Sequence, residues 1–337
     1  MPTNARVCAQ RFWKPQTEHS QGGEYVKQSI KELKTALVLS AAMLAASMAT
    51  AEVESEEPIK IAVNEWTGQH LSANIAAELL RKKGYNVELV TAGGLPQFTA
   101  LAQNELHFNP EVWDNSITDV YTDGLASGAI VDMGELGLIP REGWMYPDYM
   151  AEKCPGLPDY QALFDCAQAF ATAETFPDGR LITYPADWGT RSKSVAEGIG
   201  LPFVPVPGGS EGAMVAELKS ALASKDPILM MFWQPHWIFA EVDMNWVEWN
   251  PIDGECVEED QQRETACGFA QASVKKIASN SLAKTWPGAA ALLEQFALTN
   301  EDQNAMIFAV DQDGRPLEEV VQEWITNNED QWSVWIN

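Results

Sequence analysis

Basic residues, histidine and cysteine are scarce in this sequence of 337 residues. It has 22 lysines and arginines against 48 acidic residues, for a formal net charge of −26, with four histidines and five cysteines. This charge argues against binding to nucleic acid or to an anionic membrane surface, because both are negatively charged. The hydrophobic fraction of 46% is ordinary for a globular protein, and the length suffices for two lobes or two domains.

Motifs for cofactors and metals are missing as well. The sequence has no H-E-x-x-H zinc motif, no phosphate-binding loop and no dinucleotide fingerprint. Residues 311–314 begin like a calcium loop, but the oxygen ligand at the fifth position and the glutamate at the twelfth are absent. We therefore predict no cofactor and no metal site.

One motif of a hydrolase is present at residues 208–212, which read G-x-S-x-G between an expected strand and an expected helix. A secreted serine hydrolase using Ser210 is therefore an alternative function. Its triad is incomplete, because His236 follows only a short way on and the nearest acid, Asp226, precedes that histidine. The simpler interpretation is that Ser210 caps the helix that begins near Ala213.

The N-terminus has the pattern of a secretory signal. Three lysines between residues 27 and 34 precede an apolar run over 36–48, which ends in Ala49-Thr50-Ala51. The run is too short to span a bilayer. We predict that residues 1–51 are a signal peptide with an N-terminal extension, removed after Ala51, and that the protein is periplasmic.

Four cysteines remain after this cleavage, in two pairs that are close in sequence. Two local disulfides, Cys154 with Cys166 and Cys256 with Cys267, are the simplest pairing for an exported protein. The alternative, a zinc site of four thiolates, requires two-residue spacings that these pairs do not have.

Apolar patterns predict alternating strands and helices after residue 58, which is typical of an α/β fold with mainly parallel sheets flanked by helices. The expected strands are 59–63, 86–90, 106–108, 129–133, 180–184, 203–206 and 228–232. The expected helices are 72–83, 116–127, 192–198, 214–223, 271–277, 289–296, 301–310 and 316–327. Two such units joined by two crossings predict lobe 1 at 58–143 plus 240–337, lobe 2 at 144–239, and a ligand cleft between them.

Tryptophan is abundant, with thirteen residues. Trp66, Trp113, Trp188 and Trp233 each follow a strand-like stretch, and α/β proteins bind ligands at the carboxyl ends of strands. A trimethylammonium group has no N–H, so hydrogen bonds cannot select it, whereas indole faces can, at roughly 0.5–2 kcal/mol per ring. The alternative for each tryptophan is a place in an aromatic core.

Four motifs carry a family resemblance over residues 58–337. They are Trp-Gln-Pro-His-Trp at 233–237, Asn-Glu-Trp-Thr-Gly at 64–68, Asn-Pro-Glu-Val-Trp at 109–113 and Asp-Trp-Gly at 187–189. In these motifs the chain resembles the periplasmic substrate-binding components of ABC importers for glycine betaine, choline and related methylated amines. The resemblance implies a two-lobe, type II binding-protein fold without catalysis, a membrane permease as partner and a monomer.

The resemblance also implies site residues. Trp113, Trp188 and Trp233 match the walls of the family's tryptophan cage, Trp66 and Trp144 match walls used in some members, and His236 matches a polar residue beside the cage.

Glu111 departs from the family pattern and bears on the ligand. Choline-type members have a carboxylate where this chain has Gly68, and here Glu111 lies two residues before Trp113 instead. If Glu111 faces the cleft, it repels a ligand carboxylate and favours a ligand without one, for which we predict trimethylamine N-oxide; glycine betaine, or choline or carnitine, is the alternative. If it points away, the glycine betaine interpretation stands.

Overall fold

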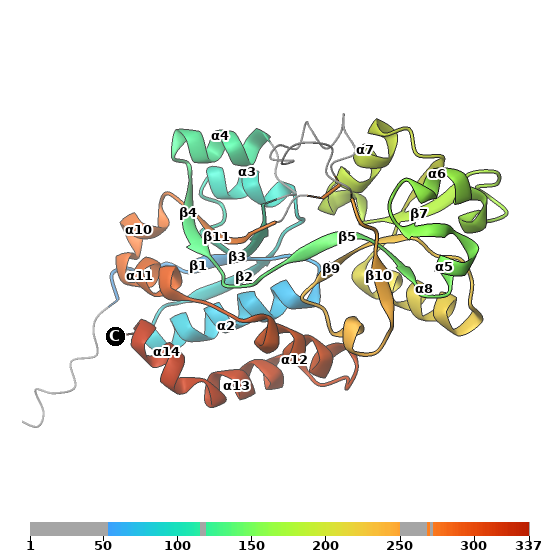
Figure 1. The fold of residues 1–337 in the computed structure, drawn as a ribbon. Coiled ribbons are helices and arrows are strands. Elements are labelled where there is room, and N and C mark those ends of the chain that lie inside the picture. Colours follow the sequence, from blue (N-terminus) through green and yellow to red (C-terminus); the bar gives the residue numbers. More distant parts are fainter. Residues whose placement is uncertain (1–52, 115–118, 250–267, 270–271, 337) are drawn as a thin grey trace, which may run out of the picture. The chain divides into compact units, whose positions relative to one another are not determined.

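Two five-stranded sheets organise the residues that this computed structural model describes, which are 53–114, 119–249, 268–269 and 272–336 (Figure 1). The predicted signal peptide and the pair Cys256 and Cys267 lie outside the described residues. The structure therefore tests neither prediction. No helix in the described ranges combines the length and apolar character needed to cross a membrane.

The first sheet belongs to lobe 1 and has the strand order β2-β1-β3-β11-β4. Strand β11 is antiparallel to both of its neighbours, whereas β1 is parallel to β2 and β3. Its strands are β1 (Ile59–Val63), β2 (Val87–Thr91), β3 (Phe108–Trp113), β4 (Ile130–Glu135) and β11 (Val274–Ser279). The helices of this lobe are α2 (Thr67–Lys83), α3 (Pro96–Ala102), α4 (Asp119–Ser127), α10 (Leu282–Thr285), α11 (Pro287–Gln295), α12 (Asn300–Asp311), α13 (Leu317–Asn327) and α14 (Glu329–Ile336).

The second sheet belongs to lobe 2 and has the order β10-β5-β9-β7-β8, in which β5 is antiparallel to β9 and β10. Its main strands are β5 (Arg141–Pro147), β7 (Gly179–Thr183), β8 (Phe203–Pro207), β9 (Met230–Gln234) and β10 (Met244–Trp246), with a short β6 (Pro155–Pro158) outside the sheet. The α-helices are α5 (Met150–Lys153), α6 (Ala162–Cys166), α7 (Arg191–Gly198) and α8 (Glu211–Ser224). The short 3₁₀ helices are η1 (Ala167–Phe170), η2 (Ala186–Trp188) and η3 (Trp237–Ala240).

The two sheets share one arrangement that no repeat in the sequence indicates. In each, three strands that follow one another in the chain pair in parallel, and one antiparallel strand separates them from a fourth. The antiparallel strand is β11 in lobe 1 and β5 in lobe 2, and each begins where the chain has crossed from the other lobe. This is the two-lobe α/β fold that the sequence predicts.

The sheet pairing differs from the predicted lobe boundaries at both crossings. Residues 141–143 and 244–246, which the prediction gave to lobe 1, pair within the second sheet as parts of β5 and β10. The predicted helix at 271–277 is also wrong, because residues 274–277 belong to strand β11. Hydrogen bonds to β3 and β4 on both sides of β11 decide this conformation, and a local pattern cannot report them.

Helix α2 joins the first sheet to the C-terminal helices. Ten of its seventeen residues are buried, and it packs against β1, β3, α12, α13 and α14 (Figure 1). Its N-terminus follows β1 after only three residues, so Trp66 lies directly between strand and helix. This short connection fixes one wall of the site described below.

Two predictions for lobe 2 are confirmed. Cys154 and Cys166 form a disulfide. Ser210 caps helix α8, since its Oγ accepts a hydrogen bond from the backbone N–H of Ala213 at 3.2 Å. The serine that suggested a hydrolase thus has a structural role.

Candidate functional site

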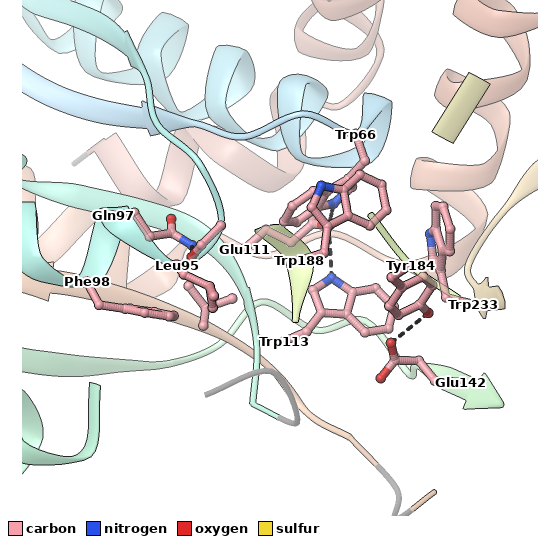
Figure 2. A pocket seen from close by; sticks show the side chains of 12 residues that line it. Trp66, Leu95, Gln97, Phe98, Glu111, Trp113, Glu142, Tyr184, Trp188 and Trp233 are labelled. Atoms are coloured by element: carbon pink, nitrogen blue, oxygen red, sulfur yellow. Dashed lines mark hydrogen bonds between the residues drawn. The ribbon is translucent and has the colours of Figure 1, made fainter. Parts of the chain in front are cut away.

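A cavity of about 60 Å³ lies where the strand ends of the two lobes meet (Figure 2). Lobe 1 and lobe 2 both contribute aromatic rings and one carboxylate each to its lining. The lining residues are Trp66, Gly94, Leu95, Gln97, Phe98, Glu111, Val112 and Trp113 from lobe 1, and Glu142, Tyr184, Trp188 and Trp233 from lobe 2.

Strand ends position these rings, as the sequence predicts. Trp113 is the last residue of β3, Trp233 lies near the end of β9, and Tyr184 directly follows β7. Trp188 ends the short helix η2, a few residues beyond the same strand. Because β7 and β9 are parallel neighbours, their carboxyl ends bring Tyr184 and Trp233 together, with ring centroids 5.6 Å apart.

Two pairs of the lining tryptophans pack edge to face. Trp66 and Trp188 come from different lobes, and their centroids are 5.2 Å apart at an interplanar angle of 64°. Trp188 and Trp233 are 5.6 Å apart at 75°. Trp188 and Trp233 are also buried, so their orientations are fixed by packing before any ligand enters.

Glu111 is buried at the cavity wall, and the protein already supplies partners to both of its oxygens. Its Oε1 accepts the indole N–H groups of Trp66 at 2.8 Å and Trp113 at 3.2 Å. Its Oε2 accepts from Ser72 Oγ and Gln303 Nε2, both at 2.7 Å. Burial raises the pKa of Glu111, and these four donors oppose that shift. Glu111 therefore lines the cavity with both oxygens bonded by the protein, and a bond from it to a ligand stays a prediction.

Glu142 is a second buried carboxylate on the cavity, and it is bonded less completely. Tyr184 donates its hydroxyl to Oε1 at 2.7 Å (Figure 2), whereas no described residue donates a hydrogen bond to Oε2. Arg191 Nη1 is 3.7 Å from Oε2. Burial raises the pKa of Glu142, against the opposing effects of Arg191 and Tyr184. This carboxylate can donate or accept a proton toward a ligand in the cavity.

Sequence reasoning missed Glu142 and Tyr184, although weak signals for both exist. Tyr184 ends a predicted strand in the same way as the predicted tryptophans. Glu142 lies in the crossing segment, and its neighbour across the sheet, Trp233, is known only from the register of β5 with β9. A pairing between residues so far apart in the chain cannot be read from local pattern.

The structure places Trp144 outside the cavity lining. It is completely buried in the core of lobe 2, next to Trp249 and Phe269, and donates its indole N–H to Ser192 Oγ at 2.6 Å. Strand β5 continues into the second sheet beyond Glu142, so each later residue lies farther from the strand ends.

The structure places His236 beside the cavity lining rather than in it. It packs beside Trp233, with ring centroids 5.3 Å apart, but it does not reach the cavity lining. Its Nδ1 accepts the backbone N–H of Ile238 at 3.1 Å and thereby caps helix η3. That bond leaves Nε2 as the donor toward Glu211 Oε1, at 3.2 Å.

Glu211, His236 and Asp311 form the group of side chains in the described residues whose ligand atoms lie close enough for a metal, within 4.8 Å of one another. Each carboxylate has other partners as well. Thr67 donates its backbone N–H to Glu211 Oε2 at 2.8 Å and its hydroxyl to Asp311 Oδ1 at 2.9 Å. Trp237 donates to Asp311 Oδ2 at 3.1 Å. We assign this cluster to contact between the lobes, since its hydrogen bonds join residues of both.

Comparisons with known proteins agree with this fold. The trimethylamine N-oxide-binding protein of Pelagibacter ubique (strain HTCC1062) is 27% identical over 313 residues, which cover 91% of this chain and 98% of that protein. Among solved structures, the glycine betaine/L-proline-binding protein (ProX) of Borrelia burgdorferi aligns with a TM-score of 0.69 at 19% identity, covering 83% of this chain and 97% of that one. An ABC-transporter choline-binding protein in complex with choline also gives 0.69, at 17% identity, covering 85% of this chain and 93% of that one.

A family match extends over residues 57–327, which is most of the sequence. The family is described as the substrate-binding domain of ABC-type glycine betaine transport systems, whose members are binding components of transporters and not enzymes. The chain belongs to this family of substrate-binding proteins.

Proposed function

We propose that this protein binds trimethylamine N-oxide in the aromatic cavity and delivers it to an ABC importer. The observation that carries the proposal is Glu142, a buried carboxylate on the cavity whose Oε2 receives no hydrogen bond from the described residues. A buried polar atom of this kind normally has a partner, and a ligand in the cavity can supply it.

The charge of the lining favours a ligand without a carboxylate. Glu111 and Glu142 contribute acidic side chains, and the described lining residues include no lysine, arginine or histidine. The carboxylate of glycine betaine would meet two acids and no basic side chain, whereas a methylated nitrogen would meet indole faces and attractive charge. The cavity volume of about 60 Å³ is about four to six times the space that one enclosed water needs, which suits a compact ligand.

The N-oxide group complements Glu142 chemically. Its oxygen accepts hydrogen bonds, so it needs a donor, and burial raises the pKa of Glu142 toward the protonated form that donates. One proton shared between Glu142 Oε2 and the N-oxide oxygen gives both atoms a partner. The methyl groups then face the indoles of Trp66, Trp113, Trp188 and Trp233. The similarity to a trimethylamine N-oxide-binding protein supports the same ligand.

Calorimetry against trimethylamine N-oxide, glycine betaine, choline, carnitine and proline tests this proposal. We expect trimethylamine N-oxide to bind most tightly. We expect Glu142→Gln to weaken the binding of this ligand by about 1.5–3 kcal/mol, the value of a charge-assisted hydrogen bond. Tightest binding of glycine betaine would transfer the assignment to that ligand. A serine-reactive probe should leave Ser210 unlabelled, because its hydroxyl caps a helix.

The transport role sets the remaining expectations. We propose that the protein works in the periplasm as a monomer, exported by the signal within residues 1–51, and that a membrane permease is its partner. Edman sequencing of the exported protein should begin directly after Ala51. Co-purification with a permease encoded nearby would distinguish an importer component from a chemoreceptor-associated sensor, which the same fold can serve.

A further inference from the structure

Glu111 lines the cavity beside two of its four indoles, and one of its atoms accepts a hydrogen bond from each of them. Oε1 accepts the N–H of Trp66 from the start of α2 and the N–H of Trp113 from the end of β3. Glu111 and Trp113 are two residues apart in the strand, so their side chains share a face of the sheet. One carboxylate oxygen on the cavity wall thus holds two of the lining rings.

We propose that Glu111 is a positioning residue that selects a cationic ligand through Trp66 and Trp113, without a bond to the ligand. The inference rests on the proposed function in one respect, namely that the cavity binds a methylated ammonium group. In this proposal the charge of the ligand is recognised by Trp66, Trp113 and Glu111 together, and not by the two rings alone.

The first part of this role is orientation. An indole donates only through Nε1–H, so a fixed acceptor fixes the rotation of the ring in its own plane. Glu111 is itself held from three sides, by Ser72 and Gln303 at Oε2 and by a bond from its own backbone N–H to Asn109 Oδ1 at 2.8 Å. Both rings therefore have one preferred position before a ligand arrives.

Gly68 leaves room for this arrangement. A Cβ added at Gly68 would lie 3.1 Å from Gln303 Nε2 and 3.2 Å from its Cδ, so the Gln303 amide would have to shift by a few tenths of an ångström. Without a side chain at residue 68, Gln303 reaches Glu111 Oε2. The acidic group of lobe 1 thus lines the cavity with its oxygens already bonded to Gln303, Ser72 and the two indoles.

The second part of the role is charge. A hydrogen bond to a carboxylate polarises the donor, so electron density moves from the N–H into the indole. A ring face with more electron density attracts a cation more strongly. An uncharged ligand of the same shape gains nothing from this polarisation. The effect of Glu111 should therefore depend on the ligand's charge and not on its shape.

Glu111→Gln separates charge from position. The glutamine keeps an oxygen that can accept from both indoles, and its amide can donate to Ser72 Oγ if the Gln303 amide turns to present its oxygen. The probes are tetramethylammonium and tert-butanol, which have similar volumes but differ in charge. Glu88→Gln is the matched control, since Glu88 is an exposed acid on β2 of the same lobe.

We expect Glu111→Gln to lower the affinity for tetramethylammonium about 5- to 50-fold and to change the affinity for tert-butanol less than twofold. Glu88→Gln should alter neither. An equal loss for both probes would reduce Glu111 to a structural residue, and no loss for either would refute the inference; the proposed function would stand in both cases.

Indole N–H signals in ¹H–¹⁵N spectra provide a test that needs no ligand. Two signals, assigned by their loss in Trp66→Phe and Trp113→Phe, should move upfield in Glu111→Gln because a neutral acceptor polarises the N–H less. If neither probe binds the native protein, the cation-binding proposal fails, and these two signals alone decide the inference. Unchanged signals would overturn it.

Discussion

Trp188 of lobe 2 donates its indole N–H to Glu65 Oε2 of lobe 1 at 2.9 Å. The bond crosses the interface between the lobes directly beside the cavity, where Trp188 also meets the ring of Trp66. Thr67, two residues after Glu65, makes the other contact of this segment with lobe 2 through Glu211. The short connection between β1 and α2 thus contacts lobe 2 on both sides of Trp66, so closure of the lobes and assembly of the aromatic lining are linked.

We predict that Glu65→Ala weakens ligand binding about 3- to 10-fold, the value of one partly exposed charge-assisted hydrogen bond. The loss should appear mainly in the dissociation rate, because the bond forms only when the lobes are together. Stopped-flow fluorescence with trimethylamine N-oxide measures both rates.

A double-mutant cycle with Trp188→Phe isolates this bond, since phenylalanine keeps an aromatic face but has no N–H. In that background Glu65→Ala should have no further effect. If the two losses simply add, Glu65 acts by some route other than Trp188.

The aromatic lining gives a second prediction. Trp188→Ala and Trp233→Ala should each weaken ligand binding by about 1–3 kcal/mol, or about 5- to 150-fold in Kd, since each removes an indole from the cavity lining. Trp144→Phe is the matched control, because Trp144 is buried away from the cavity and should lower the melting temperature without changing Kd. Calorimetry and thermal unfolding on the same samples distinguish the two effects. Normal affinity in either alanine variant would contradict the assignment of the lining.

The pH dependence of binding gives a third prediction, with opposite signs for two ligands. Burial raises the pKa of Glu142 above the ordinary 4.5. Above that raised pKa the free carboxyl is ionised, so a complex that shares a proton with trimethylamine N-oxide must take one up. Its affinity should fall with rising pH, by at most tenfold per unit.

Tetramethylammonium has no oxygen and is attracted by the ionised carboxylate. Its affinity should therefore rise as pH increases through the same pKa. Glu142→Gln should flatten both curves. Binding titrations with both ligands between pH 4.5 and 9 measure how each affinity depends on pH. Parallel curves for the native protein would argue against a shared proton.

The disulfide gives a fourth prediction. Cys154 and Cys166 are 12 residues apart, and closing a loop of this length stabilises a protein by roughly 3 kcal/mol. The double variant Cys154→Ser, Cys166→Ser should melt at a lower temperature and bind with unchanged affinity, because neither cysteine lines the cavity. Thermal unfolding with and without saturating ligand measures both properties. Weakened binding by the folded variant would show that the disulfide also shapes the site.

The sequence by itself determined the fold class and most of the aromatic lining. Buried strands can be recognised from short apolar runs, and the residue after such a run lies at a known edge of a parallel sheet. Trp66, Trp113, Trp188 and Trp233 satisfy this rule, and all four lie on the cavity. The helix cap at Ser210 could also be predicted from the sequence, because a cap depends on residues within one turn of the helix.

Only the tertiary structure decided which polar groups line the cavity. The register of β5 with β9 places Glu142 beside Trp233 and carries Trp144 into the core. Partners from three separate segments occupy the oxygens of Glu111. The direction of a side chain within a sheet changes with a shift of one residue in register, and register depends on hydrogen bonds between strands distant in the chain. A local pattern contains no record of those bonds, so charge at the site follows from the folded protein alone.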